Sequence, residues 1–202
     1  NMRERDKKTI MQSDYHKKAA MKQFQSINKK AYPIIKCKAE NALEKALEYT
    51  SQSAVVPDVI FFDLPGTANT KGVLTTLKNM DFIFSPITAE RLVVESTLGF
   101  TKAFLGLPQT EDDKKEQFIW LFWNQVDGRE KTGLYDAYQR VISELNLSIM
   151  ETRIMDSKRF RKETDDTGNY VFRSSLLPAE PQLMKATKMD FFVEEFLKIV
   201  HL

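Results

Sequence analysis

The residues best suited to chemistry follow a short apolar run in the first third of the sequence. In DVIFFDLPGTANT, residues 58–70, the run 59–62 ends at Asp63, and Pro65 and Gly66 come soon after. A carboxylate at the end of a strand can hold a magnesium-bound water. A glycine three residues later lets a backbone N–H approach a γ-phosphate, because no Cβ is in the way. The alternative is structural: Asp63 caps the next helix or accepts hydrogen bonds from the turn, which Pro65 stiffens.

A second candidate pair follows a later apolar run. Asn124 and Asp127 stand in the sequence NQVD, directly after QFIWLFW. An asparagine amide can bridge the donor and acceptor edges of a purine, and a carboxylate can accept hydrogen bonds from guanine N–H groups. The pattern is close to the guanine-reading Asn-Lys-x-Asp, but Gln125 stands where that pattern has lysine. A solvated turn with an Asx hydrogen bond is the alternative, and the residues alone leave both open.

One part of a nucleotide site is missing from the sequence. A phosphate-binding loop of the Gly-x-x-x-x-Gly-Lys-Ser/Thr type needs a glycine followed by lysine, and none of the seven glycines has lysine after it. Without those backbone amides and that lysine, the β- and γ-phosphates lose most of their stabilisation. The 202 residues are therefore expected to bind nucleotide weakly or not at all.

Other catalytic classes find little support in the sequence. His16 and His201 stand in expected helices with no metal-ligand pattern around them, and no Ser–His–Asp or Cys–His arrangement can be argued. Cys37 is the single cysteine, so it can form neither an internal disulfide nor a CxxC zinc site. Metal-dependent hydrolases are thus not indicated.

Helices and strands are predicted to alternate along the chain. Helical periodicity predicts helices over residues 14–28, 39–51, 71–79, 89–105, 131–145 and 184–200, and apolar runs predict strands over residues 31–37, 59–62, 81–85, 117–123 and 147–154. Strands that alternate with long helices are typical of βαβ units and a parallel sheet. The expected fold class is therefore α/β, a mostly parallel sheet with helices on both faces.

This fold class indicates where a ligand would bind. In open parallel sheets, ligands bind beyond the carboxyl ends of the strands. That rule selects the segments that follow the predicted strands, which are residues 63–69, 85–88, 124–127 and 154–157. Thr88 in the second of these is also a plausible N-cap for the helix that follows. The last helix is expected to pack through Phe191, Phe192, Phe196, Leu197 and Val200.

Composition and charge fit one cytosolic α/β domain spanning residues 1–202. The hydrophobic fraction is 42%, no apolar run approaches the roughly 18 residues needed to span a membrane, and the opening segment is charged rather than signal-like. Residues 1–38 hold eleven lysines and arginines against three acidic residues, a net charge of +8. Such an excess could meet nucleic acid, although a solvated helix face is the commoner explanation.

Three motifs in order carry a resemblance to a known family. DVIFFDLPG, then DFIFSPITAERLVVES, then WLFWNQVDGR resemble the ParA/MinD family of deviant-Walker ATPases. In that family a strand ending in Asp-x-Pro-Gly, a strand ending in a Pro-Ile-like turn and a strand ending in Asn follow one another. The most similar group is the TraA/ParA-like proteins of conjugative elements, whose tail also resembles YVFRSSLLP, residues 170–178. The similarity runs from about Tyr32 to the C-terminus.

The resemblance implies roles for the candidate residues. It implies a P-loop NTPase-like fold in which Asp63 is the Walker B-type aspartate near magnesium and the attacking water. Gly66, after Pro65, would belong to the switch that senses the γ-phosphate, and Asn124 would contact adenine. ATP and Mg²⁺ are the implied cofactors of a full-length protein. Family members begin with a unit made of a strand, a P-loop, a helix and a second strand. The expectation is that this chain is the larger, C-terminal part of such an ATPase and lacks that first unit. A natural relative without a P-loop is the alternative.

The resemblance also implies partners. In the family, ATP binding sandwiches two protomers, and the dimer binds DNA non-specifically and meets a ParB-like or conjugation partner protein that stimulates hydrolysis. The work would be DNA partition or conjugative transfer. The candidates for phosphate contacts are basic and lie late in the chain: Lys158, Arg159, Arg161, Lys162, Lys185 and Lys188.

Two other functions stay open at this stage. A GTPase of the same broad class is one, because DLPG satisfies Asp-x-x-Gly and NQVD approximates the guanine motif, although Gln125 and the SPITAE turn argue against it. The second is a non-enzymatic α/β module that binds nucleic acid through the basic residues 1–38. Its affinity would fall steeply with salt and would not respond to nucleotide.

Overall fold

The computed structural model describes residues 32–66, 70–107, 118–130, 132–161 and 181–202, with nine isolated positions between 8 and 25. These residues form two compact units, which are described separately below. One unit comprises Ile34–Phe122 and Thr132–Met150. The other comprises Asn1–Pro33, Trp123–Lys131 and Glu151–Leu202.

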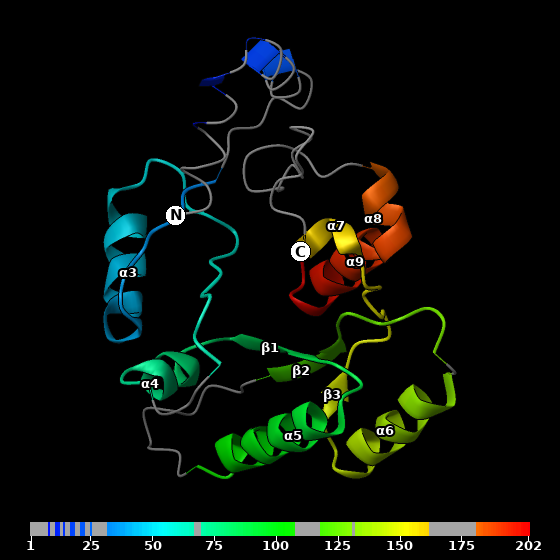
Figure 1. The fold of residues 1–202 in the computed structure, drawn as a ribbon. Coiled ribbons are helices and arrows are strands. Elements are labelled where there is room, and N and C mark those ends of the chain that lie inside the picture. The colour runs from blue at the N-terminus through cyan, green and yellow to red at the C-terminus, as the bar shows by residue number, and fades with distance from the viewer. Residues whose placement is uncertain are drawn as a thin grey trace. The chain divides into compact units, whose positions relative to one another are not determined.

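The first of these units contains a small parallel sheet (Figure 1). Its strands are β1 (Phe82–Ile87), β2 (Phe118–Trp123) and β3 (Ser148–Ile149), and they lie side by side in the order β1-β2-β3. Strands β2 and β3 are parallel, with Trp120 opposite Ser148 and Leu121 opposite Ile149. The chain is therefore an α/β protein with an open three-stranded sheet, as the alternating pattern predicted.

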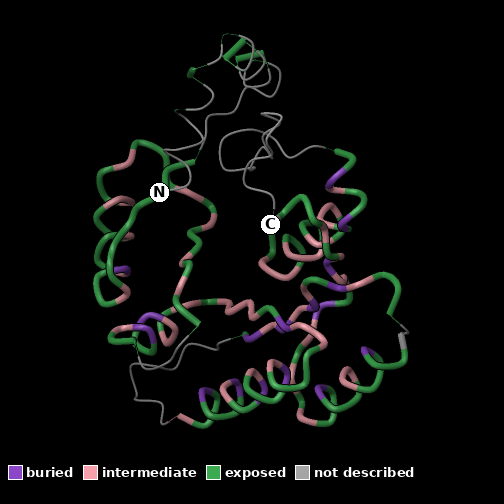
Figure 2. The backbone as a smooth tube through the Cα atoms, viewed as in Figure 1, coloured by how far each residue is buried: buried purple, intermediate pink, exposed green. Residues whose placement is uncertain are grey.

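Two helices pack against this sheet. Helix α5 (Arg91–Leu105) contacts β1, and α6 (Thr132–Glu144) contacts β3. Both lie on the same side of the sheet in Figure 1. In α5 the buried residues recur at helical spacing, so that one face of the helix meets the core (Figure 2). They are Val94, Leu98, Thr101 and Phe104.

The core of the unit lies between these helices and the sheet. Leu121 of β2, Ile87 of β1, Ile142 of α6 and Met150 are fully buried. Along β2 the side chains alternate, because successive residues of a strand point to opposite faces: Ile119, Leu121 and Trp123 are buried, and the residues between them are not. On that second face Phe118 stacks on Phe82 of β1, with ring centroids 5.6 Å apart.

A second contact in this unit joins α4 (Val73–Lys78) to η1 (Ala39–Asn41), a turn of 3₁₀-helix. The helix α3 (Ala42–Gln52) follows η1 directly. Gly72 precedes α4 with φ +85°, and its backbone lies against that of Glu40. The Thr76 hydroxyl donates to the carbonyl of Ala39 (3.0 Å), and Lys71 pairs with Glu40 (3.2 Å). The start of α4 is thus fixed to η1.

The other unit contains α7 (Lys158–Arg161), α8 (Pro181–Thr187) and α9 (Met189–Ile199). A single helix over residues 184–200 was expected, but Lys188 adopts a left-handed conformation (φ 57°) that separates α8 from α9. Leu183 and Thr187 of α8 are buried.

The packing side expected for the last helix is only partly right. Phe192, Phe196 and Val200 are partly buried, whereas Phe191 and Leu197 are exposed, and no residue of α9 is fully buried. All five residues follow the break at Lys188, so the difference arises within α9: apolarity alone assigned a packing face wider than the one that is partly buried.

Two predicted strands are absent from the described residues. Residues 32–37 and 59–62 form neither helix nor strand, and Ile60 and Phe61 are exposed, Phe61 by 75%. An apolar run favours a strand through packing against neighbouring strands and helices, and neither segment has a strand beside it. The prediction was wrong because it relied on apolarity alone and did not identify a strand with which either segment could pair.

Smaller differences concern boundaries. The strand predicted over residues 147–154 is only two residues long; after it, Met150 and Ile154 donate single backbone hydrogen bonds to Leu121 and Trp123, and Met155 forms an isolated bridge with Val126. Helix α5 starts at Arg91 with Glu90 at the N-cap and no capping side-chain hydrogen bond, so Thr88 is not the cap. The other helices and strands of this sheet unit that the structure describes end within two residues of the predicted ends.

The helix predicted over residues 14–28 lies mostly outside the described residues. The six described positions within it, 14, 17, 18, 21, 22 and 25, are all helical. Among the helices that the structure describes, none has the length and apolarity that a membrane crossing requires.

Candidate functional site

The loops that follow β2 and β3 are joined by backbone hydrogen bonds. The N–H of Ile154 donates to the carbonyl of Trp123, and the N–H of Val126 donates to the carbonyl of Ile154, both at 2.9 Å. Val126 then accepts from the N–H of Asp156, also at 2.9 Å, and forms a parallel bridge with Met155. Residues 124–127 and 154–157, two of the segments that the sequence analysis selected, are therefore paired with each other.

Asn124 is the first residue after β2 and is partly buried. Its side-chain oxygen accepts a hydrogen bond from the N–H of Gln125 (2.9 Å), and Gln125 adopts a left-handed conformation with φ 56°. Among the described residues, the side-chain NH₂ of Asn124 has no hydrogen-bond partner. Asn124 therefore has a donor available at the end of the sheet, while its oxygen helps to shape the loop.

Asp127 is held by Arg129, which the sequence analysis did not single out. The guanidinium donates from Nε to Oδ1 (2.9 Å) and from Nη2 to Oδ2 (2.6 Å), and the N–H of Arg129 also donates to Oδ1 (2.9 Å). These hydrogen bonds lower the pKa of Asp127 from 3.8 to about 2. Both carboxylate oxygens are thus occupied by the protein's own donors, and the pKa of Arg129 is raised in turn.

Asp63, Pro65 and Gly66 belong to the unit that contains the sheet and are exposed. Among the described residues, Asp63 has no hydrogen-bond or ion-pair partner, so neither structural alternative, a helix cap or a turn acceptor, is observed for it. A Cβ at Gly66 would meet nothing within 4 Å, and its φ is not left-handed. Residues 67–69 of the same predicted segment lie outside the described residues.

The site residues fall into both units, so each group is assessed by itself. Asn124 and Asp127 lie in the unit that contains α9, and Asp63 lies in the unit that contains the sheet. In the segment 85–88, at the end of the strand predicted over residues 81–85, Ser85 is partly buried within β1, Pro86 is exposed and Ile87 is fully buried. Ile87 belongs to the core rather than to a binding surface.

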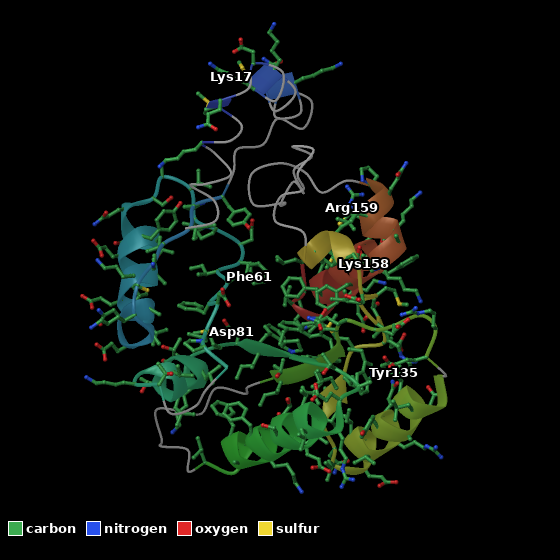
Figure 3. The ribbon with its side chains drawn as sticks, viewed as in Figure 1. Lys17, Phe61, Asp81, Tyr135, Lys158 and Arg159 are labelled. Carbon is green, nitrogen blue, oxygen red and sulfur yellow. The ribbon has the colours of Figure 1, made fainter. Side chains whose placement is uncertain are left out.

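The basic candidates that the structure describes lie on or beside α7 and α8, in the unit that contains α9. Lys158, Arg159, Lys185 and Lys188 are exposed, and Figure 3 shows Lys158 and Arg159 on α7. The N–H of Met155 donates to the carbonyl of Thr187 (3.0 Å), so the residues before α7 lie beside the end of α8. Lys162 and the side chain of Arg161 lie outside the described residues.

Glu195 on α9 is a further contact residue that sequence reasoning missed. Its carboxylate accepts from the N–H of Glu151 (2.7 Å) and from the N–H of Thr152 (2.9 Å). These amides follow β3 and lie 43 and 44 positions away in the sequence. A glutamate in an amphipathic helix has no local feature that would have identified this contact.

The fit of a magnesium ion depends on the donors present. The described residues contain no group of three or more His, Cys, Asp or Glu that could hold a metal ion by themselves. Asp63 supplies a single unpaired and exposed carboxylate, which suits contact through a water to an ion held mainly by phosphates. The donor set therefore fits a nucleotide-bound magnesium better than a resident metal.

Comparisons with known proteins add nothing to these observations. No protein-family model, no curated protein and no solved structure matches the chain. The resemblance to deviant-Walker ATPases stays a prediction that rests on the order of three motifs.

Proposed function

We propose that this chain carries the base-contacting and magnesium-facing parts of the nucleotide site of a ParA-like ATPase. The observation that supports the proposal is the pairing of the loops after β2 and β3, the first of which begins with Asn124, the residue directly after β2. Ligands of open α/β sheets bind beyond the carboxyl ends of the strands. The full fold proposed is P-loop NTPase-like, with a larger parallel sheet covered by helices on both faces.

Each candidate residue has a proposed role. The free side-chain NH₂ of Asn124 suits a contact with a ring nitrogen of adenine. The carboxylate of Asp63 would bind a magnesium-bound water and orient the attacking water, and Gly66 would let a backbone N–H approach the γ-phosphate. Magnesium, when bound with ATP, neutralises charge that develops on the phosphates. The phosphate-binding lysine loop is not among these 202 residues and must be supplied from outside them.

Adenine is preferred over guanine in this proposal because of Asp127. Guanine reading needs a carboxylate that accepts from the N–H groups of the base, and Arg129 already donates to both oxygens of Asp127. A guanine nucleotide would have to displace a charge-assisted pair. The GTPase alternative is thereby disfavoured, and direct competition between ATP and GTP tests it.

The proposed biological role follows the resemblance. ATP-dependent dimerisation, non-specific association with DNA and a ParB-like or conjugation partner protein would serve partition or conjugative transfer. Lys158, Arg159 and Lys185 are exposed and suit contacts with phosphate groups.

The test of the proposed function is magnesium-dependent ATP hydrolysis by the protein with its phosphate-binding loop supplied. Asp63→Ala is expected to abolish turnover and leave the melting temperature nearly unchanged, because the exposed carboxylate has no partner in the described residues. Asp58→Ala is the matched control, since Asp58 is also exposed and lies five residues earlier. Unchanged turnover in Asp63→Ala would sink the assignment.

The runner-up is a nucleic-acid-binding module without enzymatic activity, supported by the net charge of +8 over residues 1–38. It predicts DNA binding whose affinity falls steeply with salt and is the same with and without Mg·ATP. If ATP changes neither DNA affinity nor oligomeric state, the runner-up replaces the ATPase.

A further inference from the structure

One side chain of helix α9, Glu195, is hydrogen bonded to the backbone of Glu151 and Thr152. The two carboxylate oxygens of Glu195 each accept one backbone N–H, from Glu151 at 2.7 Å and from Thr152 at 2.9 Å. Hydrogen bonds to an ionised acceptor are the strong class, and two successive amides on one carboxylate fix its orientation. Glu195 thereby fixes the backbone where the chain leaves β3.

The contact continues toward Asn124 through the backbone. Two residues beyond Thr152, Ile154 donates to Trp123 and accepts from Val126. Asp156 then donates to Val126, so the segment that follows Thr152 pairs with Trp123 and with both backbone groups of Val126, on either side of Asn124 and Gln125. Every bond in this series lies within one unit, and each is between 2.7 and 2.9 Å.

The loop needs such support, because its conformation is unfavourable by itself. Gln125 has φ 56°, a left-handed conformation that is uncommon for residues other than glycine. Such a residue persists where the surrounding structure holds it. Val126, the residue after Gln125, is held by its backbone hydrogen bonds to Ile154 and Asp156.

We propose that Glu195 is a positioning residue for the Asn124–Asp127 loop: from the C-terminal helix it fixes the segment after β3, and through that segment the loop that meets the nucleotide base. The base-binding part of this statement rests on the proposed function. The mechanical part, a coupling between α9 and the loop, stands on the hydrogen bonds alone.

The experiment is residue-resolved amide hydrogen exchange on the 202-residue chain. Glu195→Ala is expected to speed exchange at Glu151 and Thr152 by roughly tenfold or more, the scale of a lost charge-assisted hydrogen bond. The coupling predicts a rise of several-fold at Val126 and Asp156 as well. Glu194→Ala is the matched control, because Glu194 is the exposed neighbour on the same helix, and exchange should not change.

A conservative variant separates positioning from general stability. Glu195→Gln keeps the shape and one acceptor but turns an NH₂ toward the second amide, so exchange at Val126 should fall between the wild type and Glu195→Ala. A rise confined to Glu151 and Thr152 would overturn the proposal. So would a uniform rise that includes Met150, whose N–H donates to Leu121 in the sheet (2.8 Å), because Glu195 would then serve stability alone.

Binding of Mg·ATP to the same variants tests the base-binding part. Weaker binding in Glu195→Ala, partial recovery in Glu195→Gln and no change in Glu194→Ala support it, whereas equal affinity in all variants overturns it. If the wild-type protein with its phosphate loop binds no nucleotide, the proposed function fails and this part falls with it. The exchange pattern still decides the coupling between α9 and the loop.

Discussion

The loop that carries Asn124 and the segment that carries Asp63 both follow apolar runs, yet only the Asn124 loop follows a paired strand among the described residues. Asn124 follows a strand with a neighbour on each side, and its loop is hydrogen bonded to the segment after β3. Asp63 follows residues 59–62, which pair with no strand among the described residues. The difference shows that a strand-end residue is positioned by the pairing of its strand, not by the apolarity of the run before it.

The two regions also differ in what their polar groups do. The side-chain oxygens of Asp127 and Asn124 accept hydrogen bonds from residues of their own loop, and these contacts shape it. Among the described residues, Asp63 makes no such contact, so no hydrogen bond seen there fixes the orientation of its carboxylate. Binding through Asp63 would therefore include the entropic penalty of fixing that side chain, which raises the dissociation constant.

The largest expected effect compares the core of β2 with the unpaired run. Leu121→Ala removes a fully buried side chain and should reduce the free energy of unfolding by about 2–5 kcal/mol. Phe61→Ala removes a side chain that is 75% exposed and should change it by about 0.5 kcal/mol or less. Urea unfolding followed by circular dichroism measures both. Equal losses would mean that residues 59–62 are a buried strand, as the sequence alone predicted.

The second expected effect compares two glycines near the Asp63 segment. A Cβ at Gly72 would lie 2.3 Å from Cα of Glu40, and Gly72 has φ +85°. Gly72→Ala should therefore destabilise the protein by about 2–4 kcal/mol.

Gly66→Ala is the matched control for this pair. A Cβ there meets nothing, and the loss of unfolded-state freedom makes the change neutral or stabilising by up to about 1 kcal/mol. Thermal unfolding of the two variants distinguishes a glycine needed for packing from one kept for binding. A Gly66→Ala variant that unfolds as early as Gly72→Ala would show that Gly66 is structural.

The smallest expected effect concerns the ion pair in the Asn124 loop. The pKa of Asp127 is lowered to about 2, so the pair stabilises the folded state above about pH 4, and this contribution is lost as the pH falls through 2. In Arg129→Ala the pKa should rise back toward 3.8, because the largest cause of the shift is removed. Carboxyl-carbon NMR titration measures it.

The control for this titration is Arg91→Ala, which breaks the exposed pair with Glu95 on α5 and should leave the Asp127 midpoint in place. A midpoint that stays near 2 in Arg129→Ala would mean that the carboxylate is held by other donors. The argument for adenine would then fail, because it rests on Arg129 as the donor to both oxygens of Asp127.

The sheet and its strand-end residues could be predicted because their signals are local. The run in β2 is strongly apolar and ends in Asn124, and α5 shows clear helical periodicity. From these the parallel sheet, and the selection of the segments that follow its strands, come by general rules.

The remainder depends on partners far away in the sequence. Glu195 contacts amides 43 and 44 residues earlier, and Gly72 is needed only because Glu40 lies against it. The left-handed Lys188 that divides α8 from α9 has a side chain typical of a continuous helix. The run 59–62 has strong strand character, but strand formation needs a neighbour that a local pattern cannot supply.

The most direct test of the central claim is a ¹H–¹⁵N NMR titration with Mg·ATP of the protein with its phosphate-binding loop supplied. The account predicts shifts at Gln125, Val126 and the side-chain amide of Asn124, with a smaller response at Gly66, and weaker shifts with Mg·GTP. An absence of shifts in the Asn124 loop at saturating Mg·ATP, or shifts confined to the basic residues of α7 and α8, would contradict it.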